Sequence, residues 1–169
     1  LGNIFNKKSL FDDAVASYKK ALAIHPQDAE VFHNLGNTYA NKGMIDDAIS
    51  AYRKAVEINP NLAESHKSIA YLYKKKGQIS ESVSSFEKAT TFHPKDTNLL
   101  FDLASLYESN GLQDNAILTY KKLLSIDPAH KEAKNSLAML YNSKGVSLAL
   151  QGKKEDAIAA YKDALQNKE

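Results

Sequence analysis

Apolar residues along this chain follow a two-part pattern that returns at a fixed period. In residues 29–62 the first part is an apolar stripe at helical spacing, formed by Phe32, Leu35, Gly36 and Tyr39. A second stripe of the same kind follows and contains Ile45, Ala48, Ile49, Tyr52, Ala55 and Val56. Each copy of the pattern therefore predicts two helices, here called helix A and helix B.

Glycine and proline mark the ends of these helices. Gly43 separates the two stripes, and glycine adopts the left-handed conformation that ends a helix at little cost. Pro60 follows the second stripe and prevents helix B from continuing. One constant step relates all four prolines and the glycines between the stripes: Pro26, Pro60, Pro94 and Pro128; Gly43, Gly77, Gly111 and Gly145. A fixed period of about 34 residues indicates an array of stacked repeats.

The period divides the chain into five copies. Counting Ala29 as position 1, we expect a truncated copy at 1–28, complete copies at 29–62, 63–96 and 97–130, and a fifth copy at 131–169. Small residues recur at position 8 and position 20, where they leave room for an aromatic ring at position 24. One such helix pair cannot bury its own apolar faces, so neighbouring pairs must stack.

The fifth copy departs from the period. Up to Gly145 its residues fit the pattern of residues 29–62. After Gly145 the pattern fits only when it is shifted by seven residues, as it then matches Ala157, Tyr161 and Ala164. Because seven residues are about two helical turns, helix A is predicted to run from near Lys131 to near Gln151. Gly145 would then lie inside a helix, at a cost of about 1 kcal/mol relative to alanine.

The recurring residues resemble the tetratricopeptide repeat (TPR). The matching pattern is Phe32-x-x-Leu35-Gly36-x-x-Tyr39, Ala48-x-x-x-Tyr52 and Pro60, with Phe32 where the family usually has tryptophan. The resemblance implies an all-α fold, a TPR α-solenoid in which antiparallel helix pairs form a right-handed superhelix. It further implies a concave groove lined mainly by A helices at positions 2, 5, 9 and 12, which binds peptides or segments of partner proteins.

Composition adds mainly exclusions. The net charge of +2 does not favour nucleic acid or an anionic membrane as a partner, and no apolar run is long enough to insert into a bilayer. With no cysteine and no catalytic or phosphate-binding motif, we expect a non-catalytic protein without cofactors. The spacing of the five histidines does not favour a metal site. A cytoplasmic location suits these features, although the first residue, Leu1, suggests a piece of a longer protein.

Two aromatic residues stand at groove positions where the fold does not require them. Tyr71 and Phe101 lie on neighbouring A helices, and Lys67 and Lys74 share one helix face with Tyr71. We predict a binding centre there for a segment with an acidic residue beside an apolar one. In the alternative interpretation, Tyr71 packs onto its own layer and Phe101 fills a gap between repeats. Three polar residues complete the predicted groove: Asn34, Asn37 and Ser105.

Other interpretations remain open. Acidic pairs at the start of the B helices and the run Lys74–Lys76 are expected to be solvated helix ends. The residues required of the family's carboxylate clamp are absent, so chaperone tails ending in Glu-Glu-Val-Asp should not bind.

Two further hypotheses concern the function of the whole array. In a second hypothesis, the array is similar to the substrate-targeting region of a larger enzyme such as a protein glycosyltransferase. In a third, the array self-assembles through its ends, where the last helix would leave three residues uncovered: Ile158, Tyr161 and Leu165.

Overall fold

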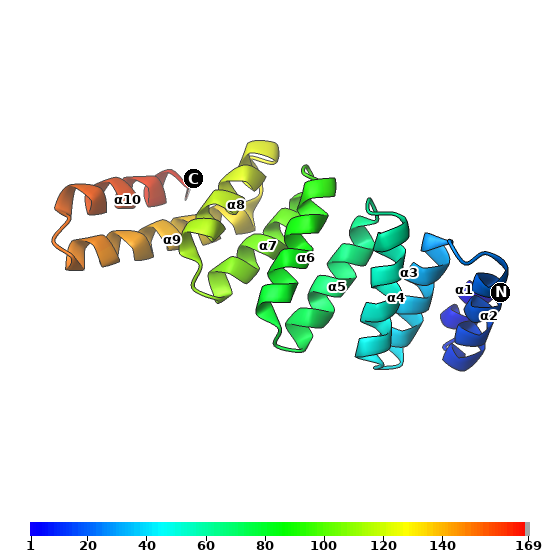
Figure 1. Ribbon diagram of the computed structural model, residues 1–169. Coiled ribbons are helices and arrows are strands. Elements are labelled where there is room, and N and C mark those ends of the chain that lie inside the picture. The colour runs from blue at the N-terminus through cyan, green and yellow to red at the C-terminus, as the bar shows by residue number, and fades with distance from the viewer. Residues whose placement is uncertain (168–169) are drawn as a thin grey trace. The chain divides into compact units, whose positions relative to one another are not determined.

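The computed structural model describes residues 1–167, and every regular element in that range is an α-helix (Figure 1). The predicted all-α fold is confirmed. The ten helices of the described residues are α1 (Gly2–Lys7), α2 (Phe11–Ile24), α3 (Ala29–Asn41), α4 (Ile45–Ile58), α5 (Ala63–Lys75), α6 (Ile79–Phe92), α7 (Thr97–Ser109), α8 (Gln113–Ile126), α9 (Lys131–Leu150) and α10 (Lys154–Gln166).

The chain forms two compact units. The first unit, Leu1–His93, holds α1 to α6, and the second begins at Pro94 and holds α7 to α10. Within each unit, helices that follow one another in sequence pack against one another, α3 on α4 and α9 on α10 among them. The two predicted helix stripes of each copy are therefore present as an A helix and a B helix.

Helix ends follow the predicted turn chemistry. Gly43 has φ of 77°, and the backbone N–H of Met44 donates to the carbonyl of Tyr39 at 2.9 Å, which satisfies one of the last carbonyls of α3. At the other end of α3, the Asp28 carboxylate accepts a hydrogen bond from the N–H of Val31 at 3.0 Å. Left-handed glycines end three further A helices: Gly77, Gly111 and Gly152.

A glycine on an A helix makes room for a tyrosine on the following B helix. A Cβ atom built on Gly36 would lie 2.7 Å from the ring of Tyr52, which is closer than two carbon atoms can approach. The same relation joins Gly2 to Tyr18, with 2.5 Å between the built Cβ and the ring. The predicted packing of position 8 against position 24 is therefore present.

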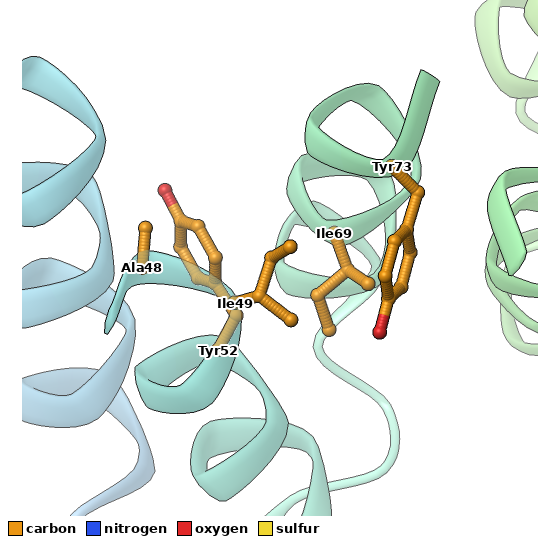
Figure 2. Packing of buried hydrophobic residues seen from close by; sticks show 5 residues of the cluster. All are labelled: Ala48, Ile49, Tyr52, Ile69 and Tyr73. Atoms are coloured by element: carbon orange, nitrogen blue, oxygen red, sulfur yellow. The ribbon is translucent and has the colours of Figure 1, made fainter. Parts of the chain in front are cut away.

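Within the first unit, α5 covers the face of the preceding B helix, α4. Ile49 of α4 lies between Tyr52 of its own helix and two residues of α5, Ile69 and Tyr73 (Figure 2). Tyr52 and Ile49 are 2% and 5% exposed, so this contact buries nearly all of both side chains. Burying an aliphatic or aromatic side chain of this size contributes about 2 kcal/mol, so the stacking of one pair on the next adds to the stability of the array.

The long helix predicted in the fifth copy is present as α9. It continues without a break through Gly145, where the regular period would place a turn. The reason for this glycine is packing: a Cβ atom on Gly145 would lie 2.6 Å from Tyr161 of α10. Helix α9 contacts both neighbouring helices. Lys144 of α9 pairs with Asp114 of α8 at 2.8 Å, and Gly145 faces Tyr161 of α10.

Ion pairs link neighbouring helix pairs at a constant separation in sequence. Lys42 pairs with Asp12, Lys76 pairs with Asp46 at 2.6 Å, and the Lys144–Asp114 pair above is the third. Lys76 and these aspartates lie at exposed helix ends, as expected, and the ion pairs are a further role that was not predicted from the sequence. Each aspartate is more than four-fifths exposed, so each pair contributes well under about 1 kcal/mol.

Candidate functional site

The groove positions of α3 carry polar side chains that the neighbouring helices hold in place. The Tyr52 hydroxyl donates to Oδ1 of Asn37 at 2.6 Å. Nδ1 of His33 lies 2.7 Å from Oγ of Ser65, a residue of α5. His33 also packs against Tyr52, with 5.4 Å between the ring centroids. These contacts fix the orientation of both groove side chains before any ligand binds.

On α5 the central groove residue is aromatic. Tyr71 meets the ring of Phe86 edge-on, with 5.3 Å between the centroids, and 41% of Tyr71 stays exposed. Lys67 and Lys74 lie one turn before and one turn after it on the same helix face. Lys67 is half-buried and Lys74 is exposed. Part of a ring is thus presented to solvent between two ammonium groups.

Tyr71 belongs to a pairing that recurs along the chain. In α1, α3 and α7, position 9 holds a polar residue that interacts with the tyrosine hydroxyl at position 24. In α5 and α6 an aromatic pair replaces this polar contact. Position 24 holds Phe86, which has no hydroxyl, and position 9 holds Tyr71, which contacts Phe86 through its ring. Tyr71 therefore packs onto its own layer, as the alternative interpretation proposed, and also keeps exposed surface. The other pairs are Asn3 with Tyr18, Asn37 with Tyr52 and Ser105 with Tyr120.

Phe101 lies on α7 in the second unit and is half-buried there. Its ring stacks on His130, with 5.2 Å between the centroids and 22° between the planes, and lies 5.8 Å from the ring of Tyr120. Ser105, also predicted as a groove residue, interacts with the Tyr120 hydroxyl at 3.1 Å. The contacts of Phe101 resemble the gap-filling role of the alternative interpretation. Its role in binding stays a prediction.

Asn34 lines a cavity in the first unit. The cavity has a volume of about 680 Å³ and lies among α1, α2 and α3, with Asn3 and Glu30 also in its wall. The carbonyl of Asn34 accepts a hydrogen bond from the Thr38 hydroxyl at 2.9 Å. The equivalent position 6 of the next A helix is Ser68. Its hydroxyl interacts with the Tyr52 hydroxyl of the same protein. Position 6 therefore contributes partly to packing.

Burial governs the electrostatics of two histidines. Burial lowers the pKa of His33, although the carboxylates of Glu64 and Glu30 oppose this. Burial also lowers the pKa of His66, with Lys88 acting in the same direction and the hydrogen bond to the Pro60 carbonyl at 3.0 Å opposing it. Both imidazoles are therefore neutral at pH 7. No group of three or more metal-binding side chains occurs within residues 1–167.

The lowered pKa of His66 predicts acid lability. In the unfolded chain His66 binds a proton near pH 6.5, whereas the folded protein binds it only at lower pH. Stability should therefore be constant above about pH 7 and fall as the pH decreases through the lowered pKa. We expect His66→Gln to reduce the difference in Tm between pH 8 and pH 5. The measurement is thermal unfolding at both pH values, and an unchanged difference would show that His66 does not cause the lability.

Comparisons with known proteins give the family. Models of the tetratricopeptide repeat match residues 29–62, 97–130 and 51–83, and a TPR repeat model matches residues 2–43. The chain belongs to the tetratricopeptide-repeat family, and its fold is the TPR solenoid. No curated protein matched the sequence significantly. In the range that the structure describes, each helix is too short or too polar to cross a membrane.

Solved structures share this fold. The crystal structure of MamA is 27% identical, with a TM-score of 0.73 over 99% of this chain and 94% of that one. YrrB, described as a TPR protein with an unusual peptide-binding site, is 21% identical, with a TM-score of 0.67 over 98% of this chain and 82% of that one. MamA 41-end from Desulfovibrio magneticus RS-1 is 15% identical, with a TM-score of 0.67 over 98% and 90% of the two chains. The last two show likeness of fold alone.

Proposed function

We propose that this protein is a non-catalytic scaffold that binds a segment of a partner protein along the groove positions of its A helices. The observation that carries the proposal is Tyr71, which keeps 41% of its surface exposed between Lys67 and Lys74 on one face of α5. A ring already fixed against Phe86 loses little conformational freedom on binding, which favours a role as an anchor. The two ammonium groups favour a ligand with an acidic residue beside an apolar one.

The neighbouring groove residues support binding rather than catalysis. Ser65 and His33 stand at a distance typical of a nucleophile and its base, 2.7 Å between Oγ and Nδ1. Ser65 has no exposed surface, however, so its hydroxyl cannot reach a substrate. The peptide-binding site named for YrrB gives a precedent for this mode in a protein of the same fold. Position 6 gives no support to the glycosyltransferase alternative, because Ser68 and Ser136 hydrogen-bond to tyrosines.

The recurring pairing offers a variant that removes the exposed ring without opening the core. Tyr71→Asn combined with Phe86→Tyr would rebuild in α5 and α6 the pair that Asn37 and Tyr52 form in α3 and α4. We expect this double variant to keep its Tm within a few degrees of the parent value. It should lose at least ~30-fold in affinity for a groove ligand, the usual effect of removing a central aromatic anchor.

The test is selection from a random peptide library displayed on phage, followed by affinity measurement for the best peptide. We expect selected peptides to carry Asp or Glu next to an apolar residue, and their binding to weaken as salt increases. Lys54→Ala, which removes an exposed cation of α4, is the matched control and should change affinity little. Peptides without acidic residues, or equal affinity of the double variant, would contradict the proposal.

A further inference from the structure

A polar cavity in the first unit is lined by residues of α4, α5 and α6 and has a volume of about 330 Å³. Its floor consists of three residues of α5 that are each less than one-tenth exposed: His66, Ile69 and Tyr73. The polar residues of its walls come from α4 and α6: Arg53, Ser80, Glu81, Ser84, Ser85 and Lys88. We call it the α4–α6 pocket. Tyr71 is not among its lining residues, so the pocket is separate from the proposed groove site.

Two cations line the α4–α6 pocket without a carboxylate partner. Arg53 and Lys88 form no ion pair within residues 1–167. The guanidinium of Arg53 donates to the Tyr73 hydroxyl and lies 5.7 Å from the centre of that ring, which limits its conformational freedom. Burial lowers the pKa of His66, and the Lys88 ammonium lowers it further, so this charge acts on the floor of the pocket. Glu81 is the carboxylate of the lining, and Gln78 Nε2 donates to it at 3.0 Å.

The missing partner of Lys88 is present one period earlier in the chain. There the corresponding lysine, Lys54 of α4, pairs with Glu57 at 2.9 Å. The residue that corresponds to Glu57 in α6 is Thr91, whose hydroxyl donates to a backbone carbonyl of its own helix at 2.8 Å. The Lys88 charge is therefore left for another anion, whereas that of Lys54 is offset within α4.

The second unit contains the same cation-and-tyrosine contact with a carboxylate beside it. Lys121 of α8 lies 5.3 Å from the centre of the Tyr141 ring, as Arg53 lies over Tyr73. The hydrogen bond to Tyr141 raises the pKa of Lys121, burial opposes this, and the Asp163 carboxylate of the following B helix raises the pKa further. In the first unit the B helix that follows Arg53 supplies a lysine to the pocket instead.

Serine hydroxyls add uncharged donors next to the two cations. Those of Ser80 and Ser84 make no hydrogen bond inside the described part of the chain, so both can donate to a ligand. The Ser85 hydroxyl already donates to the carbonyl of Glu81 at 2.8 Å. In α4 the place of Ser80 is taken by Asp46, so α6 has a neutral donor where α4 has an anion. A guanidinium, an ammonium and free hydroxyls together form a set of donors suited to phosphate oxygens.

We propose that the α4–α6 pocket binds a phosphate monoester, with Arg53 and Lys88 as its two cations and Ser80 and Ser84 as hydroxyl donors. The planar guanidinium can donate two parallel hydrogen bonds to phosphate oxygens, and the ammonium offsets further negative charge. A carboxylate fits this set less well, because it carries one negative charge where a phosphate monoester carries nearly two. The phosphate group belongs to a phosphorylated side chain of a partner protein or to a free small metabolite.

NMR titration of the ¹⁵N-labelled chain in a buffer without phosphate tests the site with three probes. They are a blocked tripeptide with phosphoserine between two alanines, the same tripeptide with glutamate in the centre, and glycerol 3-phosphate. We expect saturable shifts at Ser84 and Ser85 for both phosphorylated probes, with dissociation constants on the order of 1 mM. The glutamate peptide should bind at least ~5-fold more weakly. Tighter binding of the phosphopeptide supports a partner protein as the source, and tighter binding of glycerol 3-phosphate supports a metabolite.

Charge variants locate the bound phosphate. Arg53→Gln and Lys88→Gln should each weaken phosphopeptide binding at least ~5-fold, because each removes a charged donor. Lys88→Glu, which puts a carboxylate on the α6 wall, should abolish binding while Tm stays close to the parent value. Lys54→Gln is the matched control, since it removes a cation of α4 that is outside the lining, and it should leave the affinity unchanged.

Three results would overturn the proposal. Equal weakening by Lys54→Gln would mean that anions are attracted by the overall charge of the surface. Equal affinity for the glutamate peptide would mean that the pocket does not recognise phosphate. Absence of saturable shifts at about ten times the expected dissociation constant would show that no site exists. None of these results bears on the groove ligand, because its test uses Tyr71 and Phe86, which lie outside the pocket lining.

Discussion

The substitution Gly145→Val is expected to destabilise the second unit by about 3 kcal/mol, the upper part of the range for overpacked interiors. Helix propensity alone predicts the opposite sign, because Gly145 lies inside α9 and glycine is a poorer helix former than valine. The packing effect is larger. Even a bare Cβ at this position would lie 2.6 Å from the Tyr161 ring, and the two methyl groups of valine add to that overlap.

Urea denaturation of the parent and variant chains measures this effect. Gly145→Ala is the graded control and should cost less, since Ala70 and Ala104 occupy the equivalent position of α5 and α7. In a chain that already carries Tyr161→Leu, the cost of Gly145→Val should largely disappear, because the ring it strikes has been removed. An increase in unfolding free energy for Gly145→Val would show that propensity outweighs packing here.

Removing the ring of Tyr120 should have a similarly large effect. Tyr120 has no exposed surface, and its hydroxyl donates to Glu108 at 2.9 Å. Tyr120→Ala leaves a cavity under Phe101, whose ring lies 5.8 Å away, and should cost about 4 kcal/mol. Burial raises the pKa of Tyr120, so the phenol remains a hydrogen-bond donor across the neutral range.

The conservative variant separates the ring from its hydroxyl. Tyr120→Phe keeps the packing and removes one donor, so it should cost only about 1 kcal/mol. Phe86 shows that phenylalanine packs well at this position of a B helix, where it is 1% exposed. Calorimetric unfolding of both variants gives the comparison. Equal losses for the two substitutions would mean that the hydroxyl network, rather than the ring, stabilises the layer.

The helices and their order could be predicted from sequence because local residues determine them. Gly43 ends α3, Pro60 follows α4, and the spacing of Leu35 and Tyr39 sets the buried face of α3. The frame change in the fifth copy was equally visible, and α9 follows it. These signals act within a few residues of the structure that they specify.

Other features depend on which side chains meet, and sequence reasoning treated them one residue at a time. Tyr71 was interpreted alone, whereas its partner Phe86 on the next helix explains why the ring is there. Lys76 was assigned to a helix end, although lysine follows aspartate at the same separation in three places. Searching for residue pairs at constant separations would have found both relations. The stacking of Phe101 on His130 has no such recurring signal.

Helix α9 combines two registers of the repeat, the regular period and the same period shifted by seven residues. The helix therefore acts as a spacer whose length changes in steps of seven residues. Ala138 stands at the small-residue position of the regular period, and Gly145, which faces Tyr161 of α10, stands seven residues further along the helix. Seven residues advance along a helix by about 10 Å and change the facing direction by only ~20°. Adding a heptad to an A helix therefore moves the next helix along the axis while keeping its contact side. Helix α9 has 20 residues where α3 has 13, and Tyr161 still packs on Gly145 as Tyr52 packs on Gly36.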